Sequence, residues 1–455
     1  MNIQELIKDF WERIFSIERD EPESGPPVEP GLYHALEEAD GMYTRFHLRV
    51  ERDGSGLLIA NAAAAAQLSP SGAVIAKGLL DGQDENEILH RLQAHFEGGA
   101  EEQMRTDIAQ VTGLIRQITN PRDAYPLFTL NDAAFSPYEA QLIAPLQASV
   151  PLADPTRMTP LLRRLWEVGI PNVTVLAPEE FERSDLIRAI ELAEDLGMIA
   201  GVRGRATDLW DEELLQDVMM AGVDHVTVLY AATDPALHDA LCGAGDHAAA
   251  TALFDWLEAN EICAIAEMPL TQRTAQELEA TVEEMAELGV DNIAFVAYVL
   301  TEEPTSEKWS EKSEEKDDAL AVAALPQLEA QVEEAATQTQ MRFLWAPPMP
   351  RRPEIPLAAQ VRQGPRCTED TAVRVEPNGE VIPSRGPIQS VGNILKDDWE
   401  TIWQHDAFRI YREKVEPPLT YNEQFEYPDP ADLQIPVMDT EHTEDESDAQ
   451  TGGIE

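Results

Sequence analysis

The sequence predicts an α/β protein whose largest unit is a parallel sheet, with a smaller α+β unit before it and a short hairpin after it. Between residues 140 and 300, apolar runs of strand length alternate with amphipathic stretches of helical period. Several of these stretches end in glycine, a common helix stop. Six such repeats imply a parallel sheet, either doubly wound or closed into a partial (β/α) barrel.

The apolar runs define where the strands of this sheet are expected. They are Leu142–Leu152, Val173–Leu176, Met198–Val202, His225–Tyr230, Ile262–Pro269 and Asn292–Val299. Each is short enough for a buried strand, and an amphipathic helical stretch separates it from the next. We therefore place this domain at residues 135–300.

The preceding unit, at residues 31–122, reads as a hairpin followed by three helices. Arg45–Glu51 and Leu57–Asn61 flank Asp53-Gly54-Ser55-Gly56, a turn sequence typical of hairpins. Ser69 is placed to cap the first helix, and two more amphipathic helices follow. Residues 1–30 read as an amphipathic helix and a Pro-rich acidic linker.

The last third of the chain contains three segments of different character. Residues 301–345 read as an acidic linker and a helix. Residues 346–418 hold two short strands, Thr371–Glu376 and Glu380–Pro383, joined by a Pro-Asn-Gly turn. Residues 419–455 are acidic and lack periodicity, which predicts disorder.

The charge of the chain is strongly negative. Asp and Glu number 85 against 33 Lys and Arg, which gives a net charge of −52. Lysine is scarce, with none between Lys77 and Lys308, and the acidic excess runs through every segment rather than forming one patch for a basic partner. Such a surface stays hydrated when salt screens repulsion, so we expect salt adaptation. Nucleic-acid binding is disfavoured because it requires a basic footprint.

Targeting signals are also absent from the sequence. No apolar run reaches the roughly 18–20 residues that span a bilayer, so no membrane partner is expected. The N-terminus is amphipathic and acidic, unlike a secretory signal peptide. We therefore expect a cytoplasmic protein.

Cysteine usage limits the metal chemistry. The three cysteines, Cys242, Cys263 and Cys367, lie far apart, and their spacing matches no zinc or iron–sulfur motif. Motifs of serine hydrolases, P-loop proteins and HExxH zinc enzymes do not occur. We therefore assign no catalytic residue and no metal ligand. His238 and Asp239 could suggest acid–base catalysis.

The first unit resembles PqqD-like peptide-recognition domains. The hairpin, the segment LSPSGAVIAKGLLDGQDENEILHRLQ and the closing helix carry this resemblance. It implies that a precursor peptide adds a strand at the sheet edge, beside the helix near residues 101–118. The candidate peptide-binding residues are Leu57, Leu58, Ile59, Ala60 and Asn61. A winged-helix-like or purely structural domain is the alternative.

The second and third units resemble the radical-SAM core and a SPASM or twitch domain. The stretch LRRLWEVGIPNVTVLAPEEFERSDLIRAIELAEDLGMIAGV follows the second and third strands of the radical-SAM core. The Pro-Asn-Gly turn, Gly392-Asn393-Ile394 and the later Ile402, Trp403, Phe408 and Arg412 follow the SPASM pattern. The resemblance implies a partial (β/α)6 TIM-like barrel of the radical-SAM type, with a small winged-helix-like PqqD-like domain before it and a degenerate SPASM domain after it. It also implies packing and helix capping, rather than acid–base catalysis, for His238 and Asp239.

The cofactor-binding features of the radical-SAM family are missing. The family binds a [4Fe–4S] cluster through CxxxCxxC after the first strand, but here no cysteine precedes Cys242. Its GGEP motif corresponds to the vestigial cofactor rim Ala177, Pro178, Glu179 and Glu180. The SPASM ligands are reduced to Cys367, with Ser384 at another ligand position. We therefore expect that neither the cluster nor S-adenosylmethionine binds.

This pattern resembles the pseudo-radical-SAM/SPASM proteins of haloarchaeal type. The resemblance implies a non-catalytic accessory protein that binds a precursor peptide and assists a cluster-bearing radical-SAM enzyme in RiPP-like peptide or cofactor maturation. One alternative is a barrel enzyme of a different mechanism that uses Glu179, Arg203 and Tyr230 at the barrel rim. A second alternative is a radical-SAM enzyme with an unrecognised cluster site.

Overall fold

The computed structural model describes most of the three predicted units. The described residues are 27–39, 42–60, 64–96, 100–119, 142–300, 318–352, 355–367, 372–385 and 388–412. The expected N-terminal helix, most of the acidic linker after the barrel, Asn61 and the acidic tail lie outside these ranges. Within the described part, no helix is long and apolar enough to cross a membrane.

The N-terminal unit is a four-stranded antiparallel sheet with three helices. Its elements are β1 (Gly31–Ala39), β2 (Met42–Val50), β3 (Gly56–Ala60), β4 (Ala64–Leu68), α2 (Pro70–Leu80), α3 (Glu85–His95) and α4 (Glu101–Thr119). The strands pair in chain order. The predicted hairpin is β2–β3, and the predicted helices are α2–α4. Strands β1 and β4, which the sequence did not indicate, extend this hairpin on both sides.

The helices of this unit begin at side-chain caps. The Ser69 hydroxyl accepts a hydrogen bond from Gly72 N at 3.1 Å at the start of α2. Asp84 and Glu87 form a capping box at the start of α3. Such caps satisfy backbone N–H groups that have no partner within the helix. The three helices enclose a separate apolar core with one face of the sheet.

The barrel unit alternates strands with helices as predicted. Its strands are β5 (Gln147–Pro151), β6 (Asn172–Leu176), β7 (Ile199–Gly204), β8 (His225–Leu229), β9 (Cys263–Leu270) and β10 (Asn292–Leu300). Its helices are α5 (Pro155–Glu167), α6 (Arg183–Asp195), α7 (Ala206–Leu209), α8 (Glu212–Met220), α9 (Pro235–Cys242), α10 (Asp246–Ala259), the 3₁₀ helix η1 (Thr274–Glu277) and α11 (Leu278–Glu287).

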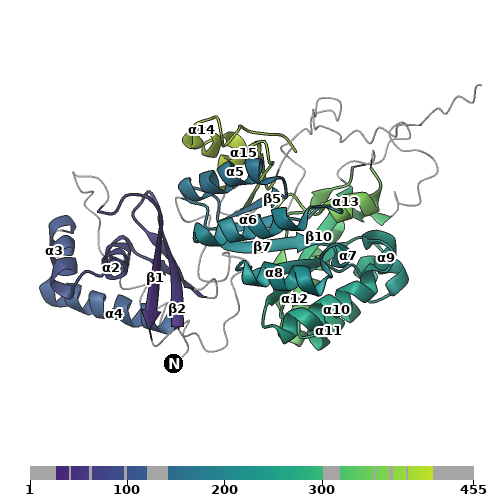
Figure 1. The fold of residues 1–455 in the computed structure, drawn as a ribbon, viewed down its shortest axis with the longest axis horizontal. Helices are drawn as coiled ribbons and strands as arrows, with labels where there is room; N and C mark the ends of the chain where they lie inside the picture. The colour runs from purple at the N-terminus through teal and green to yellow at the C-terminus, as the bar shows by residue number, and fades with distance from the viewer. Residues whose placement is uncertain are drawn as a thin grey trace, which may run out of the picture.

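Strand order decides between the two architectures that the sequence left open. Strands β5 to β10 are all parallel, and each pairs with the next in chain order. A doubly wound sheet reverses its strand order at a switch point, whereas a (β/α) barrel does not. The unit is therefore half of a (β/α) barrel, with α6, α8, α10 and α11 following one another along the outside (Figure 1).

The C-terminal part of the chain adds strands to both edges of this sheet. Its elements are β11 (Leu320–Ala321), the 3₁₀ helix η3 (Val322–Ala324), α12 (Leu325–Thr339), β12 (Arg342–Trp345), β13 (Met349–Pro350), α13 (Leu357–Gln363), β14 (Ala372–Val375), β15 (Val381–Pro383), α14 (Trp399–Trp403) and α15 (Asp406–Arg412). The short strands β11, β12 and β13 pair with β10. The predicted hairpin is β14–β15, and it continues the barrel sheet because β14 pairs in parallel with β5.

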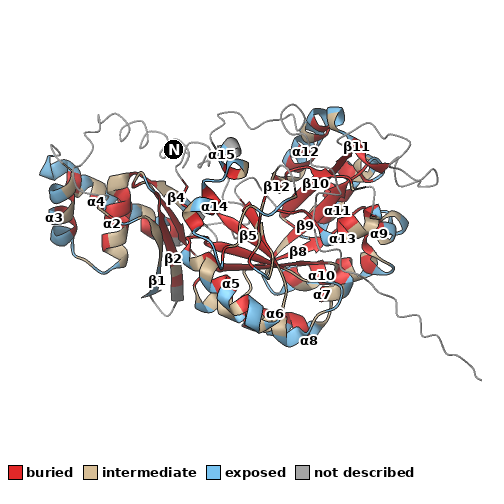
Figure 2. Cartoon of the chain, turned by 90° about the horizontal axis from the view of Figure 1, so that it is seen from above, coloured by how far each residue is buried: buried red, intermediate tan, exposed pale blue. Residues whose placement is uncertain are grey.

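Both faces of the barrel sheet are buried, and its strands are red in Figure 2, but the two faces differ in polarity. Alternate strand residues such as Val173, Val226 and Ile293 pack against the helices in one large apolar core. The residues between them point to the inner face, where many side chains are polar and buried, among them Asn172, Thr174, Arg203, His225, Thr227, Glu267 and Asn292. The inner face is thus the polar side of the barrel.

The segment that leads into β5 joins all three units. Fully buried Arg49 of β2 donates to the carbonyls of Ala144 and Pro145, and the carboxylate of Glu51 accepts from Ile143 N at 2.7 Å. From the other side, the indole of Trp399 in α14 donates to the Ile143 carbonyl at 2.9 Å. Both neighbouring units are therefore bound to the same stretch of barrel backbone.

Candidate functional site at the barrel mouth and the N-terminal sheet

The carboxyl ends of the barrel strands surround a buried ion pair. Arg203, near the end of β7, donates to Glu267 of β9 through Nη2 at 2.6 Å and Nε at 3.2 Å, and both side chains are almost fully buried. Tyr298 of β10 lies on the same face with a buried hydroxyl, and burial raises the pKa of this phenol. This is the end of the barrel where such folds hold their ligands.

Helix α13 fills this end of the barrel. Its Leu357 and Val361 pack with Leu229, Val296 and Tyr298, which point inward from the ends of β8 and β10. Arg203 also donates to two carbonyls of the last turn of this helix, those of Arg362 at 2.7 Å and Val361 at 3.3 Å. The protein's own chain therefore occupies the mouth, and Arg203 ties it in place.

A glycine makes the contact between Arg203 and α13 possible. Gly364, which ends the helix, has φ +75°, and a Cβ atom there would lie 2.5 Å from Cζ of Arg203. Any other residue would clash with the guanidinium and would strain the backbone. The end of α13 is therefore shaped around the arginine side chain.

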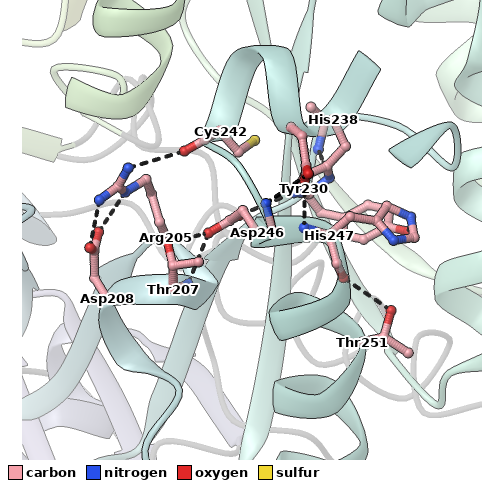
Figure 3. A network of polar contacts seen from close by, with 12 residues as sticks. Arg205, Thr207, Asp208, Tyr230, His238, Cys242, Asp246, His247 and Thr251 are labelled. Carbon is pink, nitrogen blue, oxygen red and sulfur yellow. Dashed lines mark hydrogen bonds and ion pairs between the residues drawn. The ribbon is translucent and has the colours of Figure 1, made fainter. Parts of the chain in front are cut away.

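Beyond β8, a polar network links α9 and α10 (Figure 3). His238 accepts a hydrogen bond at Nδ1 from Ala231 N at 3.2 Å, so its Nε2 carries the hydrogen and donates to Asp246 at 3.1 Å. Asp246 also accepts from the backbone N and the hydroxyl of Thr207. The neighbouring Asp239 accepts from Gly245 N and His247 N at the start of α10. His238 is therefore part of the buried network, and Asp239 caps the start of α10.

The same network contains a set of metal-ligand types. One ligand atom from each of His238, Cys242 and Asp246 lies within 4.8 Å of the others, and all three residues are buried. However, both imidazole nitrogens of His238 already have hydrogen-bond partners. Burial also raises the pKa of the Cys242 thiol well above its usual range, which disfavours the thiolate that a metal requires. The arrangement fits a hydrogen-bonded core better than a metal site.

The rim residues expected from the resemblance follow β6. Ala177 is half-buried, and Pro178, Glu179 and Glu180 are exposed. The Glu179 carboxylate lies 3.7 Å from Arg205 and 3.4 Å from Arg362. Of the other two residues proposed for a rim enzyme, Arg203 is buried under α13, and the Tyr230 hydroxyl lies between Glu284 at 2.8 Å and His247 at 3.0 Å. The structure does not bring the three together at an open surface.

The residues near the expected cluster site do not fit a [4Fe–4S] cluster. Only Leu152, Ala153 and Asp154 connect β5 to α5, none is a cysteine, and Asp154 caps the helix by accepting from Thr156 N. Cys242 and Cys263 are buried on α9 and β9, and Cys367 is buried in the segment after α13. A hydrogen bond from Arg366 to the Pro383 carbonyl at 3.4 Å joins the segments that carry Cys367 and Ser384. These two segments together contain one thiol, that of Cys367, because Ser384 has a hydroxyl at the other ligand position.

The expected position of the peptide-binding strand is wrong. Strand β3 is internal, because β2 and β4 pair with it on either side, so no peptide strand can add to it. Its Leu57 and Ile59 are buried in the apolar core of the barrel, whereas Leu58 and Ala60 are buried in the core of the N-terminal unit. The apolar run Leu57–Ala60 agrees with burial on both faces, but the sequence did not reveal the barrel as its second packing partner.

The edge that remains beside α4 is β4. In the part of the chain that the structure describes, β4 pairs only with β3, and α4 packs against it. Ala65 and Ala66 give this edge small side chains, and Ala65 is exposed. A candidate peptide site therefore lies at β4 and α4, one strand beyond the predicted one.

The sequence interpretation missed α13 and its arginines. The segment 346–367 holds Arg351, Arg352, Arg362 and Arg366 but only one acidic residue, Glu354, in a chain of net charge −52. The acidic excess therefore does not run through every segment, as we had expected, and this local excess of positive charge was the available signal. It indicates a segment that faces the carboxylates of the barrel mouth.

Comparisons with known proteins identify the class of fold. No protein-family model matches the chain, and no curated protein matches it. The strand order and the curled parallel sheet define a radical-SAM-like half-barrel, as the sequence predicted.

Two solved structures share this fold over most of their length. The structure of SuiB from Streptococcus suis bound to S-adenosylmethionine has a TM-score of 0.51 and 12% sequence identity, and the alignment covers 84% of this chain and 91% of SuiB. SuiB bound to the precursor peptide SuiA gives a TM-score of 0.50 at 13% identity, with the same coverage. Similarity at this level of identity concerns the fold and not the activity.

Proposed function

We propose that this protein is a non-catalytic accessory protein that binds a precursor peptide and assists a separate, cluster-bearing radical-SAM enzyme in peptide or cofactor maturation. The observation that carries the proposal is α13 in the barrel mouth, where Arg203 binds the last turn of the helix. A barrel whose mouth is filled by its own chain serves as a scaffold, while the N-terminal sheet keeps an edge strand for a partner.

The peptide part of the proposal rests on β4 and α4. An extended peptide that adds to a sheet edge gains main-chain hydrogen bonds, and the alanines of β4 leave room for its side chains. The structural neighbour SuiB has been solved with its precursor peptide SuiA, which agrees with a peptide ligand for this fold. The N-terminal unit would act here as a PqqD-like recognition domain.

The loss of cofactor binding is the second part of the proposal. The three-residue connection from β5 to α5 and the three dispersed, buried cysteines support the absence of a [4Fe–4S] cluster. The contacts of α13 with the inner face support the absence of bound S-adenosylmethionine. Iron and sulfide analysis after anaerobic reconstitution tests this part, because about four irons per chain would overturn it.

Hydrogen–deuterium exchange of the full chain tests the peptide part. The probes are synthetic peptides encoded by short reading frames beside the gene. Binding should protect the amides of β4 and α4 and leave those of β3 unchanged, because β3 is already paired on both sides. Protection confined to other elements, or no binding by any candidate peptide, contradicts the proposal.

A pair of alanine variants provides the control. Ala65→Lys places a long charged side chain on the exposed face of the β4 edge and should weaken peptide binding by about tenfold. Ala323→Lys makes the same change at an exposed alanine of η3 on the barrel and should leave the affinity unchanged. Equal effects of the two variants would argue for non-specific binding.

A further inference from the structure

The geometry of the barrel mouth points to a binding site for a ligand carboxylate: we propose that Arg362, together with Arg205, forms this site and that Glu179 occupies it in the free protein. The site is independent of peptide binding at β4. It lies where β6 and β7 end: Glu179 and Arg205 come from the connections after these two strands, and Arg362 comes from α13.

The charges of the three arginines at this position are not equally balanced. Arg203 forms a bidentate pair with Glu267, and Arg205 forms one with Asp208 at 2.7 and 2.6 Å. Each of these pairs is neutral. Arg362 is the additional cation, and the carboxylate that faces it is that of Glu179.

Glu179 is held loosely in this position. One oxygen, Oε1, lies 3.4 Å from Nη1 of Arg362 and 3.7 Å from Nη1 of Arg205, both longer than the 2.7–3.2 Å of a hydrogen bond. The Glu179 side chain is 58% exposed, whereas Arg205 is 14% exposed and Arg362 is 31% exposed. Two partly buried guanidinium groups therefore converge on an exposed carboxylate that neither of them binds closely.

The guanidinium of Arg205 is held in a defined orientation. Gly243, with φ +125°, passes so close to Arg205 that a Cβ atom would lie 3.0 Å from its Nη1. Nη1 donates to the Cys242 carbonyl at 3.2 Å, which orients the guanidinium (Figure 3).

A carboxylate suits this arrangement better than other anions. The planar guanidinium of Arg362 offers a fork of two parallel N–H donors at its Nη1 and Nη2 end, where Glu179 lies, and a carboxylate accepts such a pair in bidentate geometry. Glu179, at the end of a loop, reaches the site with one oxygen only. A ligand carboxylate that approaches from solvent is free to take the bidentate position and to displace Glu179.

The test uses the full chain and titrates acetate, succinate and inorganic phosphate at constant ionic strength. Glu179→Gln removes the competing charge and should bind succinate about tenfold more tightly than the natural protein does, as measured by calorimetry. Glu182→Gln, the same change at an exposed position of the same loop, should have no effect. Affinity unchanged in Glu179→Gln overturns the proposal.

Arginine variants in the Glu179→Gln background assign the site. Arg362→Gln should abolish succinate binding, and Arg362→Lys should weaken it, because lysine keeps the charge but lacks the fork. Arg157→Gln, at an exposed arginine of α5, is the matched control. Binding that survives Arg362→Gln, or phosphate binding as tight as succinate binding, contradicts a carboxylate site. A short peptide as free acid and as amide then shows whether a peptide C-terminus is also accepted.

Discussion

At the scale of single residues, the inner face of the barrel carries buried polar side chains, although the sequence runs that form its strands are mostly apolar. His225 is the clearest case, since it begins the run His225–Tyr230 and is fully buried. It packs against Gly201, where a Cβ atom would lie 2.0 Å from its Nε2. The sequence predicted the strand, but the glycine that makes room for the imidazole lies 24 residues earlier, on β7.

Burial of His225 predicts a pH dependence of stability. Burial lowers the pKa of His225 from 6.5 to about 4. Because the folded state resists protonation, the unfolded state binds more protons between these pH values. The contribution of His225 to the free energy of unfolding should therefore fall by about 3 kcal/mol as the pH drops from 6.5 to 4. Below pH 4 this contribution should stay constant, because the histidine is then protonated in both states.

The His225→Gln variant isolates this contribution. Asp224 and Glu51, whose pKa values burial raises, change stability in the opposite direction as the pH falls, so the natural protein alone gives a mixed curve. The difference between natural protein and variant in urea unfolding at pH 4 to 7 removes these contributions. A difference that stays constant across this range would contradict the prediction.

At the scale of secondary-structure elements, the sequence predicted those with strong local signals and missed those defined by pairing. The capped helices α2 and α3 and the hairpin β14–β15 are where the sequence placed them. Strand β4 was missed because alanine has low strand propensity, and β1 was missed because its sequence, GLYHALEEA, contains good helix formers. Pairing with their neighbours overrides these preferences.

Helix α13 gives an element-scale prediction. Gly364→Ala places a methyl group against Cζ of Arg203 at a residue with φ +75°, whereas Gly82→Ala, at φ +74°, meets nothing within 4 Å. Both variants strain the backbone by about 1 kcal/mol, but only the first also displaces a buried guanidinium. Gly364→Ala should lower the unfolding temperature clearly more than Gly82→Ala, as measured by calorimetry. Equal shifts would mean that Arg203 does not hold α13.

At the scale of the whole molecule, the three units meet at the backbone of residues 142–146. Arg49 and Glu51 bind this segment from the N-terminal sheet, while Trp399 and Trp403 donate to the carbonyls of Ile143 and Leu142. Arg45 of β2 adds ion pairs with Glu194 and Asp224 of the barrel. These contacts fix the position of the N-terminal sheet relative to the barrel mouth.

Removal of Arg49 should release the N-terminal unit. Arg49→Met leaves Glu51 buried without its ion-pair partner, which costs about 3–5 kcal/mol at this interface. Limited proteolysis should then separate the N-terminal unit from the barrel faster than in the natural protein. Arg105→Met, at the more exposed Arg105 of α4, should leave the cleavage rate unchanged. An intact, equally resistant Arg49→Met protein would show that apolar contacts alone hold the interface.

The net charge predicts how the whole molecule responds to salt. A charge of −52 repels itself in dilute buffer, and molar salt shortens the screening length from about 10 Å to about 3 Å. The unfolding temperature should therefore rise as KCl increases from 0.1 to 2 M by calorimetry, on the order of 10 °C or more. A flat or falling curve would contradict salt adaptation.

The sequence by itself determined the order of the units, the alternation of strands and helices in the half-barrel, the helix caps and the absence of clustered thiolates. These features depend on local patterns that each segment carries alone. Only the tertiary structure decided that β3 is internal, that β4 is an edge strand of the sheet and that α13 packs on the barrel mouth with Arg203, Arg205 and Arg362 around it. The physical reason is that hydrophobic pattern reports whether a face is buried, whereas its packing partner depends on contacts between segments distant in the sequence.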